Sequence, residues 1–343
     1  MKKATLVVSK YLQNNSVFDK DAHRDDIFDR FIQLKSQFKK HAYDLSTDDI
    51  NKIDDSDIIL YSSNMPSILP REKDINKSYI ILSESAFIRP DNYDKNKHKY
   101  FHKIFTWADD LVDNKKYLKL NYAHKFPKSI NKDLKNKEKL CILISANKNP
   151  PHISKNDLYS QRREAIRWFE KNHIDDFDLY GVGWDKYKFS GMKIIRAFNS
   201  VPYFPEIFMK LTNQTYPSYK GMVDNKKEVM EKYKFSICYE NAKDITGYIT
   251  EKIFDSFFAG CVPVYWGANN ITDHIPKECF IDKRDFDSYE ELYGFIKNIS
   301  DEKYMEYLVN IENYLNSEQS LQFNSKGFSS TIISNTIGDK NDY

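Results

Sequence analysis

The sequence predicts an α/β protein made of two Rossmann-like halves that face a cleft. Short apolar runs of β character alternate with amphipathic helical segments, which is typical of parallel sheets with crossover connections. The alternation occurs twice, before and after a lysine-rich stretch at 114–139. Because Asp and Glu are interspersed there, we interpret this stretch as a solvated connection between domains, not as a basic binding patch. A length of 343 residues suits two domains, and we predict 1–135, 136–320 and a C-terminal tail at 321–343.

The N-terminal half is predicted to hold four strands and one long helix. Segments 5–9, 57–61, 78–83 and 103–107 are short and rich in Ile, Leu, Phe, Val and Thr, as buried strands are. Segment 25–39 places its apolar residues mostly on one helical face, with charged residues opposite.

The C-terminal half repeats the pattern. Strands are predicted at 140–145, 177–180, 235–239, 262–266 and 280–281, and helices at 161–171, 226–232, 251–259, 288–299 and 301–315. Ligands of open parallel sheets bind beyond the carboxyl ends of the strands, so the residues that follow each strand are the candidates for a site.

Composition excludes several classes of protein. The 52 basic and 50 acidic residues nearly cancel, so nucleic acid is not the expected partner. The sequence contains no run of 18 apolar residues, so it predicts no transmembrane helix. We interpret the N-terminus as a strand and not as a signal peptide. Four scattered cysteines suit a reducing cytoplasm. We expect no metal site, because the histidines lack ligand spacing. Three Asp-x-Asp pairs, Asp55–Asp57, Asp176–Asp178 and Asp285–Asp287, are interpreted as solvated loop acids.

One stretch concentrates polar residues at the start of a helix. After Gly247 come Tyr248, Thr250, Glu251 and Lys252, with Thr250 placed as the N-cap. A helix N-terminus favours an anion such as phosphate, and a lysine in the first turn opposes the helix dipole unless an anion is bound. Periodicity alone favours the simpler alternative, an ordinary capped helix with solvated Glu and Lys.

The same stretch resembles a known family. Segments 235–241, 247–253 and 262–267, followed by 280–282, resemble the donor-binding motif of the α-1,3/4-fucosyltransferase family, glycosyltransferase family 10. The resemblance implies a GT-B fold of two Rossmann-like domains. It also implies inverting transfer of L-fucose from GDP-fucose, with no cofactor and no metal required for catalysis.

The resemblance further implies which residues bind the donor. Asn241, Tyr248, Glu251 and Lys252 are expected to contact GDP-fucose. Lys252 would neutralise the diphosphate, and Glu251 would bind the ribose or the fucose side. The implied roles of the two halves are acceptor binding for 1–135 and GDP-fucose binding for 136–320.

An arginine on the helix at 161–171 is also implied to contact the diphosphate. Arg162 fits better, because the apolar Phe169 follows seven positions later as in the family, but the adjacent Arg163 remains an alternative. A guanidinium suits this contact because it binds diphosphate oxygens in bidentate fashion.

An inverting transfer needs a base that deprotonates the acceptor hydroxyl. The predicted strand at 78–83 runs directly into Glu84, at a sheet edge where partial burial raises the pKa of a carboxyl group. The family has a Glu-Ser-Pro context here and this chain has Glu84-Ser85-Ala86, which weakens the match. We predict that Glu84 is the catalytic base.

The predicted function is transfer of L-fucose to a hydroxyl of a glycan, with O3 of N-acetylglucosamine as the expected acceptor position. Two alternatives stay open: a GT-B transferase for another nucleotide sugar, and a catalytically silent nucleotide- or glycan-binding module. The expected location is cytoplasmic. Peripheral contact with the inner face of a membrane and a lipid-linked oligosaccharide acceptor are open alternatives.

Overall fold

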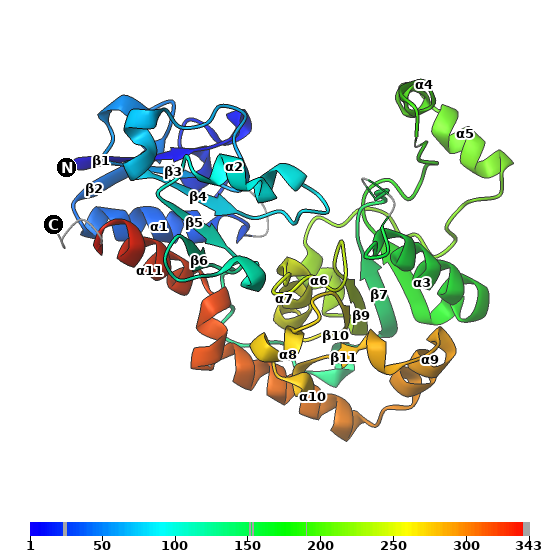
Figure 1. The fold of residues 1–343 in the computed structure, drawn as a ribbon. Coiled ribbons are helices and arrows are strands. Elements are labelled where there is room, and N and C mark those ends of the chain that lie inside the picture. The colour runs from blue at the N-terminus through cyan, green and yellow to red at the C-terminus, as the bar shows by residue number, and fades with distance from the viewer. Residues whose placement is uncertain (23–25, 151, 153, 190, 339–343) are drawn as a thin grey trace.

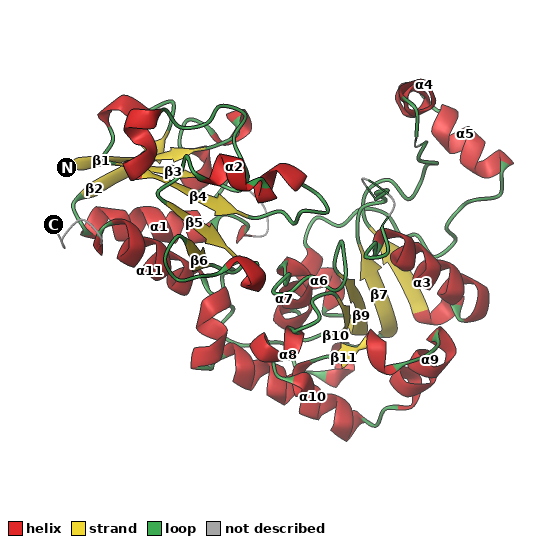
Figure 2. Ribbon diagram, viewed as in Figure 1, coloured by secondary structure: helices red, strands yellow, loops and turns green. Residues whose placement is uncertain are grey.

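The chain folds around two separate parallel sheets, which confirms the predicted class (Figures 1 and 2). The computed structural model describes residues 1–22, 26–150, 152, 154–189 and 191–338. Among these, no helix has the length and apolar character needed to cross a membrane.

The N-terminal sheet has six strands in the order β2-β1-β3-β4-β5-β6, all paired in parallel. The strands are β1 (Lys2–Val7), β2 (Tyr43–Thr47), β3 (Ile58–Tyr61), β4 (Ser78–Leu82), β5 (Lys103–Thr106) and β6 (Tyr117–Lys119). The sequence did not predict β2, whose apolar residues are mixed with Asp, Ser and Thr. The interpretation of 114–139 as a solvated connection was wrong for β6, because hydrogen bonding to β5 makes this lysine-flanked segment a strand.

Side chains of the N-terminal strands enter cores on both faces of the sheet. Leu60 lies in the core beneath α1 (Asp29–Lys40), together with Phe31 and Leu34 of that helix. Its neighbour Ile59 lies in the core on the opposite face. The predicted helix 25–39 is therefore α1, although Asp25 lies outside the described residues. A short helix, α2 (Lys95–His98), precedes β5.

The C-terminal sheet has five parallel strands in the order β11-β10-β9-β7-β8. These strands are β7 (Lys139–Ile144), β8 (Phe177–Tyr180), β9 (Tyr233–Tyr239), β10 (Val262–Trp266) and β11 (Ile281–Asp282). The helices of this half are α3 (Tyr159–Asn172), α4 (Lys193–Ala197), α5 (Phe204–Leu211), α6 (Lys226–Met230), α7 (Glu251–Phe258), α8 (Ile271–His274), α9 (Tyr289–Asn298) and α10 (Asp301–Leu315).

One Asp-x-Asp interpretation was wrong. Asp178 is not solvated but buried within β8, where it accepts a hydrogen bond from Tyr233 at 2.6 Å and pairs with Lys139 at 2.5 Å. Because Asp178 lies within β8, its carboxylate is in the interior. The ion pair with Lys139 and the hydrogen bond from Tyr233 offset the free-energy cost of burying this charge.

The segment expected as a tail contains helix α11 (Ser325–Thr336), which crosses back onto the N-terminal half. Figure 1 shows this red helix beside the blue α1. Phe328 packs edge-on against Phe31 with ring centroids 5.8 Å apart, and Ile332 enters the same core. The last helix therefore contributes apolar surface to the first domain.

A close contact joins the two halves beside the cleft. Gly247 has a φ of +78°, and a Cβ there would collide with the carbonyl oxygen of Trp107. The Trp107 ring packs against Tyr248 with centroids 4.8 Å apart. Asp109 accepts from His274 across the same interface at 3.0 Å. Glycine is required here because a larger residue would be strained and would separate the domains.

Candidate functional site

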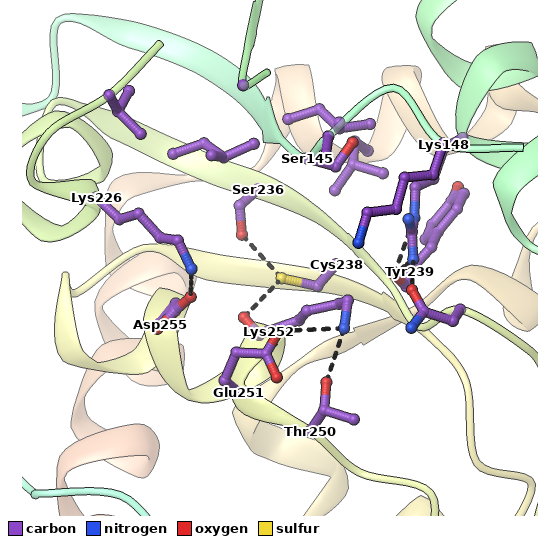
Figure 3. A pocket seen from close by; sticks show the side chains of 18 of the residues that line it. Ser145, Lys148, Lys226, Ser236, Cys238, Tyr239, Thr250, Glu251, Lys252 and Asp255 are labelled. Atoms are coloured by element: carbon purple, nitrogen blue, oxygen red, sulfur yellow. Dashed lines mark hydrogen bonds and ion pairs between the residues drawn. The ribbon is translucent and has the colours of Figure 1, made fainter. Parts of the chain in front are cut away.

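A cavity of ≈470 Å³ lies at the carboxyl ends of β7 and β9, where the two halves meet (Figure 3). Six residues that the sequence singled out line it together: Glu84, Arg162, Asn241, Tyr248, Glu251 and Lys252. Glu84 comes from the N-terminal half and the other five from the C-terminal half. Parallel strands end at the same edge of a sheet, so residues far apart in the sequence meet in this cavity.

Lys252 is held at the start of α7 by a buried carboxylate. Its ammonium donates to Oε2 of Glu240 at 3.1 Å, to Oγ1 of Thr250 at 2.9 Å and to Oε1 of Glu251 at 3.3 Å. Glu240 is completely buried, whereas the Lys252 side chain is 22% exposed. The ammonium is therefore fixed on its inner side, and its outer side faces the cavity (Figure 3).

Thr250 occupies the predicted N-cap position but does not cap the helix with its side chain. Its hydroxyl donates to Oε2 of Glu240 at 2.7 Å, and its backbone N–H donates to Oε1 of the same carboxylate at 2.8 Å. The threonine thus connects Lys252 to Glu240, since it accepts from one and donates to the other. The expected cap is replaced by a hydrogen-bond network that orients the lysine.

The ionisable side chains at the start of α7 shift one another's pKa values. Burial opposes the charged form of Lys252, but Glu240 and Glu251 outweigh burial and raise the pKa of the ammonium above its usual value. For Glu251, burial is likewise outweighed by Lys252 and Lys226, which hold the pKa of this carboxyl below its usual value. Both groups are therefore ionised at neutral pH.

One further carboxyl group on α7 lies in the cavity wall. Burial raises the pKa of Asp255 to about 6, and Lys226, which donates to it at 2.8 Å, partly offsets this increase. Figure 3 shows this pair to the left of Glu251 and Lys252.

Arg162 and Arg163 occupy different places. Arg162 is 6% exposed and lines the cavity, where its guanidinium donates to the carbonyl oxygens of Tyr239 and Glu240 at 2.8 and 2.6 Å. Arg163 instead bonds to the carbonyl oxygen of Lys148 at 3.1 Å and is not part of the cavity wall. Of these two arginines, only Arg162 therefore lies in the cavity with the residues that are expected to bind the donor.

Asn241 and Tyr248 continue the wall from Arg162. The Asn241 side chain accepts from Arg162 at 3.0 Å and donates to the Tyr248 hydroxyl at 3.3 Å. Tyr248 is 1% exposed, and burial raises the pKa of its phenol well above the usual value. It is therefore a neutral hydroxyl that can exchange hydrogen bonds with a ligand.

Glu84 enters the cavity from the loop that follows β4. Its backbone N–H donates to Asn64 at 3.4 Å, and its carbonyl oxygen accepts from Asn92 at 3.0 Å. Burial raises the pKa of its carboxyl group, an effect that Lys252 partly offsets. A half-buried carboxylate with a raised pKa is the arrangement that a general base requires.

Among the polar residues of the site that sequence reasoning missed are Glu240, Lys148, Lys226 and Tyr122. Glu240 stands inside the motif, and its place directly after a buried strand was the available signal. Lys148, Lys226 and Tyr122 line the cavity, but they come from loops or helix starts that carry no local pattern. The hydroxyl of Tyr122 donates to the carbonyl oxygen of Ser83, next to Glu84.

Comparison with known proteins supports the motif. Residues 201–331 match the family described as glycosyltransferase family 10 (fucosyltransferase) C-term. The chain is 36% identical over 81 residues to an alpha-(1,3)-fucosyltransferase of Helicobacter pylori, a match covering 24% of this chain and 17% of that protein. It is 35% identical over 106 residues to the mouse 4-galactosyl-N-acetylglucosaminide 3-alpha-L-fucosyltransferase 9, covering 29% of each. These matches span under a third of either relative.

The fold comparison covers nearly the whole chain. A crystal structure of an alpha1,3-fucosyltransferase with GDP-fucose superimposes with a TM-score of 0.54 at 15% identity, covering 97% of this chain and 89% of that one. At this identity the likeness shows the fold, which is the two-domain GT-B arrangement. Residues 201–331 therefore carry the match to glycosyltransferase family 10, the fucosyltransferases, within a chain that has the same two-domain fold as a fucosyltransferase.

Proposed function

We propose that this protein transfers L-fucose from GDP-fucose to a hydroxyl of a glycan, with inversion and without a metal in the catalytic step. The observation that carries the proposal is one cavity that combines a half-buried Glu84 with a fixed Lys252 and a buried Arg162. Displacement of a diphosphate requires a base for the attacking hydroxyl and cations that stabilise the departing diphosphate, and this cavity holds both. Residues 1–135 would bind the acceptor and 136–320 the donor.

The donor diphosphate would bind at Lys252. Its ammonium is already held by Glu240 and Thr250, so little reorganisation is needed when GDP leaves with added negative charge. Arg162 would add a second positive charge through the guanidinium edge that does not bind the carbonyl groups of Tyr239 and Glu240. Asn241 and Tyr248 would complete the contacts, and Glu251 would accept from hydroxyls of the ribose or the fucose.

The acceptor hydroxyl would lose its proton to Glu84. As its oxygen attacks the anomeric carbon of fucose, the bond from that carbon to the diphosphate oxygen breaks on the opposite face, and GDP leaves. The raised pKa of Glu84 makes its carboxylate a better proton acceptor near neutral pH. The name of the mouse relative supports O3 of N-acetylglucosamine as the acceptor position.

We also propose a cytoplasmic location, supported by four free, buried cysteines. An oligosaccharide acceptor, free or lipid-linked, would enter from the N-terminal side of the cavity, where Glu84 lies.

The decisive experiment is GDP release from GDP-fucose with a small panel of acceptors, with and without a chelator, and with UDP or GDP as competitor. We expect release that depends on an N-acetylglucosamine-containing acceptor, inhibition by GDP but not UDP, and no effect of the chelator. Inhibition by UDP would indicate another donor. No release with any nucleotide sugar would indicate a binding module, and loss of turnover with chelator would contradict the metal-free step.

A further inference from the structure

Residues 185–213 form an excursion that leaves the C-terminal half after β8. We name this segment, which contains α4 and α5, the aromatic hairpin. Figure 1 shows α4 and α5 standing away from both sheets. Ser190 within it lies outside the described residues.

The aromatic hairpin has a small core of its own. The Phe189 ring packs against Tyr187, Phe204 and Phe208, with centroids 4.7, 5.6 and 5.0 Å apart. Asn199 accepts from the Phe189 N–H at 2.9 Å and donates to its carbonyl oxygen at 2.8 Å. These contacts give the hairpin a defined shape, so its outward side chains are presented together.

Its outward side chains are unusually apolar for a surface. Met192, Ile194, Tyr203, Ile207 and Leu211 are exposed to 71%, 79%, 78%, 53% and 81%. A cluster of large exposed apolar residues on one protruding element marks an interaction site.

The same element is basic. It contains five basic residues and two acidic ones, a net charge of +3, whereas the whole chain has a net charge of +2. The basic residues are Lys186, Lys188, Lys193, Arg196 and Lys210, all exposed. Excess positive charge beside exposed apolar residues matches an anionic lipid surface. A second copy of the hairpin would bring like charges together, which disfavours self-association.

We propose that the aromatic hairpin docks the protein on an anionic bilayer, with its apolar side chains in the headgroup region and its cations on lipid phosphates. Val182, three residues before the hairpin, and Met222, nine residues after it, line the cavity. The proposal goes beyond fucosyl transfer and does not depend on it, because vesicle binding needs neither donor nor acceptor.

The test is sedimentation of the full chain with phosphatidylcholine vesicles that contain or lack 30% phosphatidylglycerol. We expect binding to the anionic vesicles only, weakened in 0.5 M salt. Lys193→Glu/Arg196→Glu should reduce the partition coefficient at least about 25-fold, about fivefold for each cation lost. Ile194→Ser/Leu211→Ser should reduce it tenfold or more. The matched control Lys39→Glu/Lys40→Glu, on exposed positions of α1, should bind as wild type.

Hydrogen exchange localises the contact and separates it from misfolding. Amides of residues 185–213 should gain protection on anionic vesicles, and both hairpin variants should keep the wild-type Tm, since the altered side chains are exposed. Equal loss of binding in the α1 control would overturn the proposal, as would protection elsewhere, no vesicle binding, or concentration-dependent self-association through the hairpin.

Discussion

Replacing Lys252 by methionine is expected to reduce both stability and fucosyl transfer, and Glu240→Gln separates the two effects. The Lys252 ammonium lies 3.1 Å from Oε2 of Glu240, whose side chain is completely buried. Removal of the ammonium leaves that carboxylate buried without its cation. Methionine keeps most of the side-chain stem, so packing changes little.

The expected loss is about 3 kcal/mol in the free energy of unfolding, the low end of the range for breaking a buried ion pair. The low end applies because Thr250 still donates two hydrogen bonds to the carboxylate, at 2.8 and 2.7 Å. In addition, the Lys252 side chain is 22% exposed. For a domain of this size, that loss lowers Tm by roughly 6–12 °C.

The double variant Lys252→Met/Glu240→Gln removes both charges. Most of the stability should return, with a coupling energy of about 2 kcal/mol between the two positions. Transfer should not return, because the donor diphosphate would still lack the ammonium that we propose binds it; we expect kcat/KM to stay at least about 100-fold below wild type. Denaturant unfolding, GDP calorimetry and GDP release measure the three quantities, with Lys326→Met at an exposed position as control.

Two results would refute this reasoning. An unchanged free energy of unfolding for Lys252→Met would mean that the pair with Glu240 does not stabilise the fold. Wild-type transfer by the double variant would mean that Lys252 does not act on the donor.

The remaining predictions concern the base and the domain contact. Glu84→Gln should lower kcat by about 10²–10⁴-fold with unchanged GDP affinity by calorimetry. Burial raises the pKa of Glu84 above 4.5, so wild-type kcat/KM should fall as pH drops through that raised value; a flat profile down to pH 4.5 would contradict the role. Gly247→Ala, strained by its φ of +78°, should lower Tm by several degrees, whereas Gly294→Ala, with nothing within 4 Å of its Cβ, should not; equal Tm values would contradict the contact. Burial opposes ionisation of Asp109, but His274 and other donors hold its pKa below the usual value. Asp109→Asn should therefore destabilise the protein at pH 7, and this loss should shrink as pH falls below 3.8 towards the lowered pKa, where the folded wild type also loses the charge; a loss in denaturant unfolding that stays constant over this range would argue against the linkage.

Local patterns predicted most of the secondary structure. The strand at 262–266 and the helix at 301–315 were predicted with their observed bounds as β10 and α10. Both are strongly apolar or strongly periodic, so neighbours in the sequence define them. The strand β6 was missed because its three residues gain their β structure only by pairing with β5.

The family and the donor motif could likewise be recognised from the sequence, because the motif is nearly contiguous. It runs from the end of β9 through the start of α7 to β10, so residues such as Asn241 and Lys252 are close in the sequence as well as in space. The choice between Arg162 and Arg163 could not be made in this way. Adjacent helix positions differ by about 100° in direction, and only packing against β9 shows that Arg162 faces the cavity.

The sequence by itself determined the two-domain α/β class and the helix start that carries the predicted donor residues, because both depend on short-range periodicity and spacing. Only the tertiary structure decided that Glu240 holds Lys252, that Glu84 shares their cavity, and that α11 returns to the first domain. The physical reason is that these contacts join residues from different elements. The free energy of burying a charge or an apolar face there depends on which surfaces meet, and no local pattern records that.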